Sequence, residues 1–301
     1  MKKNPFGKMG DFTTAPNISR LFSEMVAVWT VSYWQILGSP KKFNLIELGA
    51  GNGEMMKVMI ESFKKFPLFN KNCNIIIYEK SPSLIKIQKS KIKEKNVKWI
   101  RSLKKLNNFP SIFLANEFFD AMPIKQFLKK KDLWFERFVH ISNTYEASFI
   151  DKKTNIKSIE KKLDLKISYK QNFIEYSPLG FGYLKNIIKL IKKNNGGLLI
   201  IDYGYNKEKM NDTLQAISNK KYSDVLKNIG NSDVTYNINF HLIKKIVQTS
   251  KKLYTNFTTQ KDFLIKMGIK KRAEIISKNK TFIEKVDIYY RLKRLIDEKE
   301  M

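Results

Sequence analysis

The chain has 301 residues, of which 43% are hydrophobic and 13% aromatic, so it can bury a sizeable core as one large domain or as a domain with an insertion. The formal net charge of +29 would suit a nucleic-acid partner, but only six of the 57 basic residues are arginines, the residue suited to forked phosphate contacts. The sequence therefore favours a lysine-rich solvated surface, and nucleic-acid binding stays open as the less favoured alternative.

Features that the sequence lacks disfavour several classes of protein. No run reaches the ~18 uncharged apolar residues that a membrane span needs. The N-terminus carries lysines but no apolar signal core, which disfavours secretion. Cys73 is the only cysteine, so neither an intramolecular disulfide nor a cysteine zinc site is possible. His140 and His241 are isolated from each other, and no metal site is predicted.

The first part of the chain alternates helical patterns with short apolar strands. Residues 1–43 form a predicted N-terminal helical segment, and Ser81-Pro82 is a typical helix start. The predicted helices cover 19–37, 54–65 and 81–94, and the predicted strands cover 44–48, 74–79, 97–100 and 111–116.

The first strand runs directly into a glycine-rich loop. Glu47 lies in the strand, and Gly49, Gly51 and Gly53 follow at a spacing of two. Glycines let the main chain approach a ligand closely, and the next helix would direct free N–H groups at it. Dinucleotide-binding folds use G-x-G-x-x-G, whereas here the third glycine comes one residue early, which disfavours an NAD-dependent dehydrogenase. The loop predicts a nucleotide cofactor, with a ligand-free structural turn as the alternative.

The second part begins with a predicted β excursion over 124–150. It also contains a predicted insertion over 205–256, which is polar and irregular apart from an apolar run around 243–247. The predicted core covers 44–204, and 257–301 returns to it, so that 1–301 forms a single domain. The alternation predicts an α/β fold, a three-layer sandwich around a mostly parallel sheet. Further predicted strands cover 124–128, 133–141, 145–150 and 198–203, and further helices cover 180–193 and 260–267.

Polar residues follow two of the strands, where ligands bind in open α/β sheets. Glu79 ends the second strand, where an acid can accept hydrogen bonds from ribose hydroxyls. Asn116, Glu117 and Asp120 follow the fourth strand and would present an amide and two carboxylates to the reacting group of the cofactor. The alternative is a capped turn, because Asn and Asp favour turns and helix starts. Asp202 is expected to face the same site.

Motifs spread over nearly the whole chain resemble those of one family. They include GDFTTAP (10–16), ELGAGNG (47–53), YEKSP (78–82) with Gln88, ANEFFDAMP (115–123) and IDYG (201–204). The chain is identified by them as a member of the MidA-like class I methyltransferases, which include the mitochondrial complex I assembly factor with protein-arginine methyltransferase activity. Ala50, Asn52, Asn17 and Asn239 depart from the family pattern.

The resemblance implies a Rossmann-like methyltransferase fold with S-adenosyl-L-methionine as the cofactor. It implies that Asp11, Thr14 and Pro16, on the early loop, contribute to cofactor binding. It also implies N-methylation of a protein arginine in a subunit of the respiratory NADH dehydrogenase (complex I) during assembly. Glu117 is the first choice for the carboxylate that pairs with the acceptor arginine, and Asp120 the second.

Three alternatives to this function remain. They are a methyltransferase for RNA or a small molecule, an assembly chaperone that binds the cofactor without turnover, and the disfavoured dehydrogenase. The predicted compartment is the bacterial cytoplasm, with the mitochondrial matrix as the alternative. The sequence predicts neither the acceptor residue in the substrate, nor the number of methyl groups added, nor the oligomeric state.

Overall fold

The computed structural model describes residues 14–218, 221–227, 230, 232–250 and 252–297. The chain divides into two compact units. Unit 1 contains the described residues of Met1–Asn116, Lys189–Ile201 and Asn256–Met301, and unit 2 contains those of Glu117–Ile188 and Asp202–Thr255. The division into one domain with two insertions stays a prediction.

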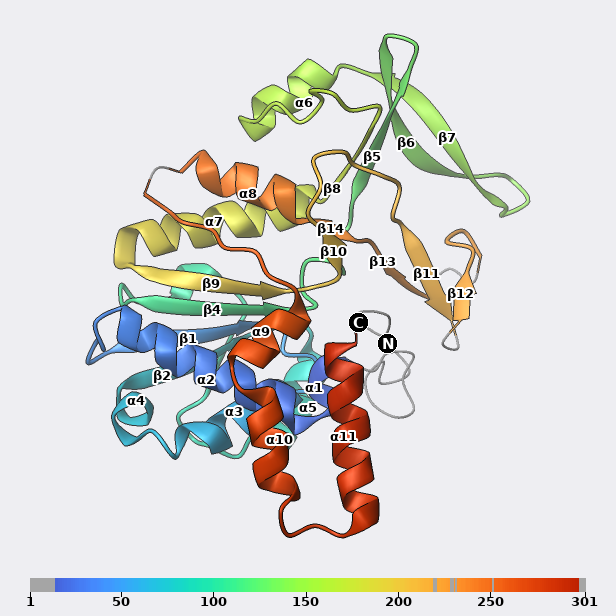
Figure 1. Ribbon diagram of the computed structural model, residues 1–301. Helices are drawn as coiled ribbons and strands as arrows, with labels where there is room; N and C mark the ends of the chain where they lie inside the picture. The colour runs from blue at the N-terminus through green and yellow to red at the C-terminus, as the bar shows by residue number, and fades with distance from the viewer. Residues whose placement is uncertain (1–13, 219–220, 228–229, 231, 251, 298–301) are drawn as a thin grey trace. The chain divides into compact units, whose positions relative to one another are not determined.

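Unit 1 is built on a five-stranded sheet in the order β3-β2-β1-β4-β9, and every pairing in it is parallel (Figure 1). Every residue of the central β1 is buried, as expected for a strand covered on both faces. This confirms the predicted parallel α/β architecture. The strands are β1 (Phe43–Leu48), β2 (Cys73–Tyr78), β3 (Lys98–Ile100), β4 (Ser111–Asn116) and β9 (Gly196–Ile201).

The last strand of this sheet starts two residues earlier than the sequence predicts. Gly196 and Gly197 pair with Ser111 and Ile112 of β4 and so belong to β9. A Cβ at Gly197 would lie 2.4 Å from the hydroxyl oxygen of Tyr33. Position 197 therefore has no room for a side chain, because the Tyr33 ring packs against its main chain, a contact that no local pattern reveals.

Two long helices of unit 1 start at recognisable side-chain caps. The Ser19 side chain accepts a hydrogen bond from Leu21 N at the start of α2, and Thr281 and Glu284 form a capping box at the start of α11. Helices α2 and α3 contribute to one hydrophobic core with the strands of the sheet. The helices are α1 (Ala15–Ile18), α2 (Arg20–Ile36), α3 (Glu54–Phe63), α4 (Pro67–Asn72), α5 (Pro82–Lys91), the short 3₁₀ turn Leu103–Lys105, α9 (Gln260–Lys266), α10 (Ile269–Ser277) and α11 (Phe282–Ile296).

Unit 2 contains an antiparallel sheet in the order β7-β6-β5-β8, a smaller antiparallel sheet β12-β11-β13, and the parallel pair β10-β14. The chain passes from unit 2 to unit 1 within α7 (Pro178–Asn194). The other elements are β5 (Lys125–Lys130), β6 (Leu133–Ile141), β7 (Ala147–Thr154), α6 (Ile156–Leu163), β8 (Phe173–Tyr176), β10 (Gly204–Tyr205), β11 (Gln215–Ser218), β12 (Lys221–Ser223), β13 (Asp233–Thr235), β14 (Ile238–Asn239) and α8 (Phe240–Gln248).

The predicted antiparallel strands of 124–150 are confirmed, and β6 has the predicted limits. The prediction that 205–256 is irregular apart from an apolar run around 243–247 is wrong, because the short strands β10 to β14 occur there, while α8 covers the apolar run. Each of these strands has two to four residues, too few for side-chain alternation to form a readable pattern. No helix of the described residues has both the length and the apolar character that crossing a membrane requires.

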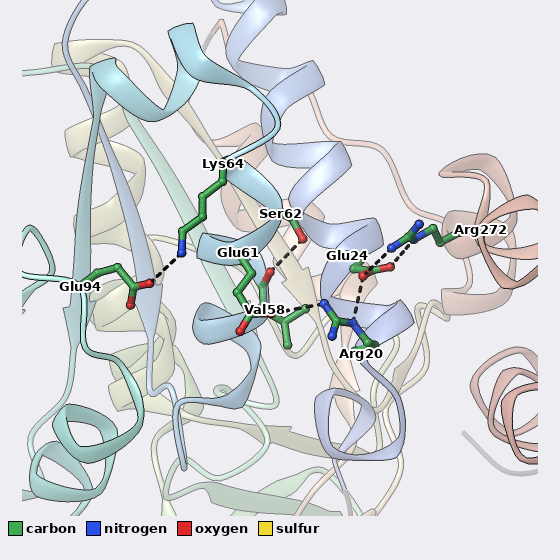
Figure 2. A network of polar contacts seen from close by, with 8 residues as sticks. All are labelled: Arg20, Glu24, Val58, Glu61, Ser62, Lys64, Glu94 and Arg272. Atoms are coloured by element: carbon green, nitrogen blue, oxygen red, sulfur yellow. Dashed lines mark hydrogen bonds and ion pairs between the residues drawn. The ribbon is translucent and has the colours of Figure 1, made fainter. Parts of the chain in front are cut away.

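An ion-pair network around the buried Glu24 connects α2 of unit 1 with α3 and α10 (Figure 2). Glu24 is 6% exposed and accepts two hydrogen bonds from Arg272, at 2.7 and 3.1 Å, and one from Arg20 at 3.0 Å. Arg20 also pairs with Glu61 at 3.3 Å. Burial opposes ionisation of Glu24, but the hydrogen bonds and charge of Arg272, followed by those of Arg20, outweigh burial and lower its pKa.

Replacing Arg272 by methionine is expected to lower the free energy of unfolding by about 2 to 3 kcal/mol near neutral pH, because it leaves the Glu24 carboxylate buried with one partner fewer. A carboxylate whose folded pKa is lowered stabilises the protein above its unfolded pKa, and this contribution is lost as pH falls through the folded pKa. Urea unfolding should therefore show the difference between Arg272→Met and the wild type shrinking as the pH is lowered below the usual pKa of a glutamate and through the lowered pKa of Glu24. Lys271→Met, at the exposed neighbouring position, is the control. An equal loss in both variants would contradict the prediction.

Candidate active site

The loop after β1 has an unusual backbone that only glycine adopts easily. Gly49, Gly51 and Gly53 have φ angles of 64°, 52° and 80°, all in the left-handed region. Gly49 N donates to Tyr78 O of β2 at 2.9 Å, and Gly53 N donates to Ala50 O at 2.7 Å. α3 begins directly after Gly53. The result is a tight strand-to-helix turn with no side chains at three of its five positions.

An early segment of the chain holds this loop. Asn52 Nδ2 donates to Asn17 Oδ1 at 2.9 Å, and Asn17 Nδ2 donates to Thr14 Oγ1 at 2.7 Å. Two of the four departures from the family pattern, Asn17 and Asn52, are thus bonded to each other, and Thr14 is brought close to the loop. Pro16 is buried in α1, with no polar contact to the loop. Asp11, the other predicted residue of this segment, lies outside the described residues.

Glu47 is a buried acid in the middle of the sheet. It is 3% exposed, and its Oε2 has no hydrogen-bond partner among the described residues. Burial, and then the nearby charge of Glu79, raise its pKa to about 8. The Glu47 carboxyl is therefore mostly protonated at neutral pH, and one buried polar atom is left for a ligand to satisfy.

Glu79 follows β2 and is held rigidly. Its Oε1 accepts hydrogen bonds from Lys80 N at 2.8 Å and Ser81 N at 2.9 Å. Its Oε2 accepts one from Gln88 Nε2 at 3.2 Å. A carboxylate oxygen can accept more than one hydrogen bond, so Oε2 keeps acceptor capacity in a fixed orientation.

A second set of acids lies in unit 2. Asn116 ends β4, and the next residue, Glu117, has a φ of 47°, which is strained for a residue with a side chain. Asp202 Oδ2 accepts hydrogen bonds from Phe119 N at 3.0 Å and from Asp120 N at 3.3 Å. Its Oδ1 accepts one from Tyr203 N at 2.9 Å. Asp202 therefore fixes the turn that carries the predicted acids.

Asp120, which lies in this turn, and Asp202, which accepts hydrogen bonds from it, compete for ionisation. Burial raises the pKa of Asp120 to about 6, with a contribution from the charge of Asp233. Burial, followed by the charge of Asp120, raises the pKa of Asp202 well above its usual range. Asp120 is 6% exposed, and its Oδ1 has no partner among the described residues. Such a pair can retain a proton, accept one, or bind a cationic group.

Comparison with known proteins assigns the chain to a family. A family model described as "Putative S-adenosyl-L-methionine-dependent methyltransferase" matches residues 25–258, which is more than half of the chain. The chain belongs to this methyltransferase family. The family resemblance, the fold class and the S-adenosyl-L-methionine cofactor predicted from the sequence are confirmed.

Curated relatives extend the similarity beyond the matched region. The chain is 28% identical to "Protein arginine methyltransferase NDUFAF7, mitochondrial" of Xenopus laevis, over 92% of this chain and 68% of that protein. It is 28% identical to the protein of the same name from Homo sapiens, over 91% of this chain and 67% of that protein. These figures place the likeness across nearly the whole chain.

Crystal structures of proteins from Burkholderia thailandensis have the same fold. One, bound to S-adenosyl-homocysteine, matches with a TM-score of 0.80 and 19% identity, over 97% of this chain and 76% of that chain. Another matches with a TM-score of 0.81 and 20% identity, over 97% of this chain and 80% of that chain.

The described residues of this methyltransferase fit the family cofactor. The left-handed glycines offer bare main chain, and the unpartnered Glu47 oxygen offers a buried polar contact. The Glu79 carboxylate is already oriented by main-chain N–H groups. A loop that merely closed a turn would need neither a buried unpartnered acid nor a second fixed acid beside it.

The structure brings the sequence-predicted residues together in two groups. Glu47, Glu79 and the glycine loop lie in unit 1, and Glu117 and Asp120 lie in unit 2. The contacts of Asp202, Asn52, Gln88 and Trp99 were not predicted. Gln88 and Asp202 stand in the matched motifs, but only the folded chain shows what they contact.

Proposed function

We propose that this methyltransferase transfers the methyl group of S-adenosyl-L-methionine to an arginine nitrogen of a protein, a subunit of the respiratory NADH dehydrogenase (complex I), during its assembly. The names of the relatives support protein-arginine methylation, and the family resemblance supports the subunit. The observation that supports a cationic acceptor is the pair of aspartates in unit 2, where the buried Asp120 has an unpartnered oxygen beside Asp202. A guanidinium would satisfy it.

The cofactor roles are assigned by chemistry. The main-chain N–H groups of the loop suit a carboxylate, and the Glu79 carboxylate suits two hydroxyls. The buried, unpartnered oxygen of Glu47 suits a hydrogen-bonding group of the cofactor. We propose that the residues that hold the cofactor are Gly49, Gly51, Gly53, Glu47 and Glu79, with Thr14, Pro16 and Asp11 of the early segment.

The positive charge of an arginine acceptor opposes its attack on the methyl group. When bound, S-adenosyl-L-methionine supplies a methyl group activated by its sulfonium. Guanidinium is protonated at neutral pH and its lone pairs are delocalised, so it is a poor nucleophile. A carboxylate bonded to it draws the positive charge away from the attacking nitrogen and accepts a proton as the new bond forms. We assign this role to Glu117, with Asp120 as the second carboxylate and Asn116 as an orienting amide.

Transfer of a labelled methyl group tests this function. The purified protein is incubated with cell extract and S-adenosyl-L-methionine carrying a tritiated methyl group, and the products are treated with protease or nuclease. We expect protease-sensitive label that acid hydrolysis releases as methylarginine. Nuclease-sensitive label would indicate an RNA methyltransferase instead. Binding of S-adenosylhomocysteine without any transfer would indicate an assembly chaperone.

The compartment follows from the host. The sequence predicts the bacterial cytoplasm, whereas the relatives carry mitochondrial names, which agree with its alternative, the mitochondrial matrix. Because the acceptor is a complex I subunit in this proposal, either compartment would have to contain the assembling complex.

A further inference from the structure

Helix α5 of unit 1 buries a single residue, and that residue is polar. Gln88 is 0% exposed, while every other residue of Pro82–Lys91 is exposed or half-buried. A helix that packs on a sheet normally buries apolar side chains, because an amide loses its water on burial. The position therefore requires an explanation in terms of what the amide contacts.

The Gln88 amide is fully hydrogen-bonded. Its Nε2 donates to Gly51 O of the glycine loop at 2.9 Å and to Glu79 Oε2 at 3.2 Å. Its Oε1 accepts from Trp99 Nε1, which lies in β3, at 3.0 Å. The indole N–H can only donate, and a carbonyl and a carboxylate can only accept, so the partners fix which way the amide faces.

Gln88 also packs against the end of the loop. A Cβ placed on Gly53 would lie 3.3 Å from Gln88 Cγ and 3.4 Å from Gln88 Cα. One side chain thus contacts the middle of the glycine loop, its last glycine, and the acid that follows β2. These are the two parts of the candidate cofactor site that the chain supplies from separate strands.

We propose that Gln88 is a positioning residue that joins the glycine loop to the Glu79 carboxylate, with Trp99 orienting the Gln88 amide. The inference rests on the cofactor roles proposed above for the loop and for Glu79. Gln88 sets the spacing between these two parts, so that both engage one ligand together. Glutamate could not replace it, because its second oxygen would face Gly51 O and Glu79 Oε2, both of which are acceptors.

The test measures cofactor affinity and stability in matched variants. Gln88→Met keeps the length of the side chain and removes its hydrogen bonds. Gln171→Met is the control, since Gln171 is a buried glutamine of unit 2 that donates to Glu208 O at 2.8 Å and accepts from Met210 N at 2.9 Å. Calorimetry gives the Kd for S-adenosylhomocysteine, and thermal unfolding gives stability.

We expect Gln88→Met to weaken binding of S-adenosylhomocysteine by roughly 10- to 100-fold, the range for hydrogen bonds to a charged group. Gln171→Met should lose comparable stability but keep its affinity within about threefold, since it contacts neither part of the site. In turnover, Gln88→Met should raise KM for S-adenosyl-L-methionine while kcat at saturation changes little, a division that simple loss of folded protein would not give.

Further variants keep the proposal falsifiable. Trp99→Phe leaves Gln88 in place, removes one hydrogen bond and should weaken binding less than Gln88→Met; it serves as the test if Gln88→Met does not fold. If the wild type binds S-adenosylhomocysteine and Gln88→Met binds it with unchanged affinity, the role of Gln88 is overturned while the cofactor site stands. If Gln88→Met does not fold, unchanged affinity in Trp99→Phe has the same meaning. Absence of binding by the wild type would overturn both.

Discussion

Replacing Glu117 by glutamine is expected to abolish methyl transfer to arginine while leaving the affinity for S-adenosylhomocysteine within a few-fold. Glutamine has almost the shape of glutamate. It is neutral, so it can neither pair with the guanidinium charge nor accept the proton that leaves the attacking nitrogen. Losing a general base typically lowers the rate by about 10²- to 10⁴-fold. Glu117 also has a φ of 47°, in the left-handed region that is strained for a residue with a side chain.

The measurement is single-turnover transfer to an arginine substrate, together with calorimetry of S-adenosylhomocysteine. Glu175→Gln is the control, because Glu175 is also a buried carboxylate of unit 2, 3% exposed, and is bonded to Gln126 and Thr213 rather than to the Asp202 turn. It should retain transfer. Turnover by Glu117→Gln close to that of the wild type would remove Glu117 from this role, and Asp120→Asn would then be examined as the second choice.

Replacing Glu79 by glutamine is expected to weaken cofactor binding by roughly 10- to 100-fold. The carboxylate now accepts from Lys80 N and Ser81 N through Oε1 and from Gln88 through Oε2. An amide at this position must direct its NH₂ group towards one of these sets of donors, so at least one hydrogen bond is lost and two donors face each other. The remaining acceptor for a ribose hydroxyl is weakened too.

Titration with adenosine and with S-adenosylhomocysteine locates the effect. Both ligands contain the ribose, so both should lose affinity in Glu79→Gln by a similar factor. Glu94→Gln, at a half-buried surface ion pair with Lys64, is the control and should bind both ligands normally. A Glu79→Gln variant that binds adenosine as tightly as the wild type does would show that Glu79 holds something other than the sugar.

Local sequence was sufficient for the frame of the site. An apolar run followed by closely spaced glycines predicts a strand, a tight turn and a helix, and β1, the left-handed Gly49, Gly51 and Gly53, and α3 follow that prediction. Glu79 and Asn116 were found because strands end where their apolar runs end. These features depend on neighbours in the chain, which is why a single sequence contains them.

The short elements of unit 2 could not be predicted in the same way. Strands β10 to β14 depend on partners such as Ala216 with Val234, which are separated by a loop and contribute few side chains each. Helix α6 was missed although it begins at the Asn155 cap and carries Ile156, Ile159 and Leu163 at helical spacing. For the strands β10 to β14 tertiary pairing decides the structure, because no strand of two to four residues is stable by itself.

The sequence by itself determined the alternation of helices with the strands of the parallel sheet, the glycine turn and the positions of acids at strand ends. Each of these follows from the spacing of apolar, glycine and polar residues within a short stretch of chain. Only the tertiary structure decided which polar groups meet: Gln88 with Gly51, Glu79 and Trp99, Asn17 with Asn52, and Glu24 with Arg272, 248 positions away. A hydrogen bond acts over about 3 Å in space and is indifferent to separation along the chain, so the partner of a buried polar side chain is known only once the chain has folded.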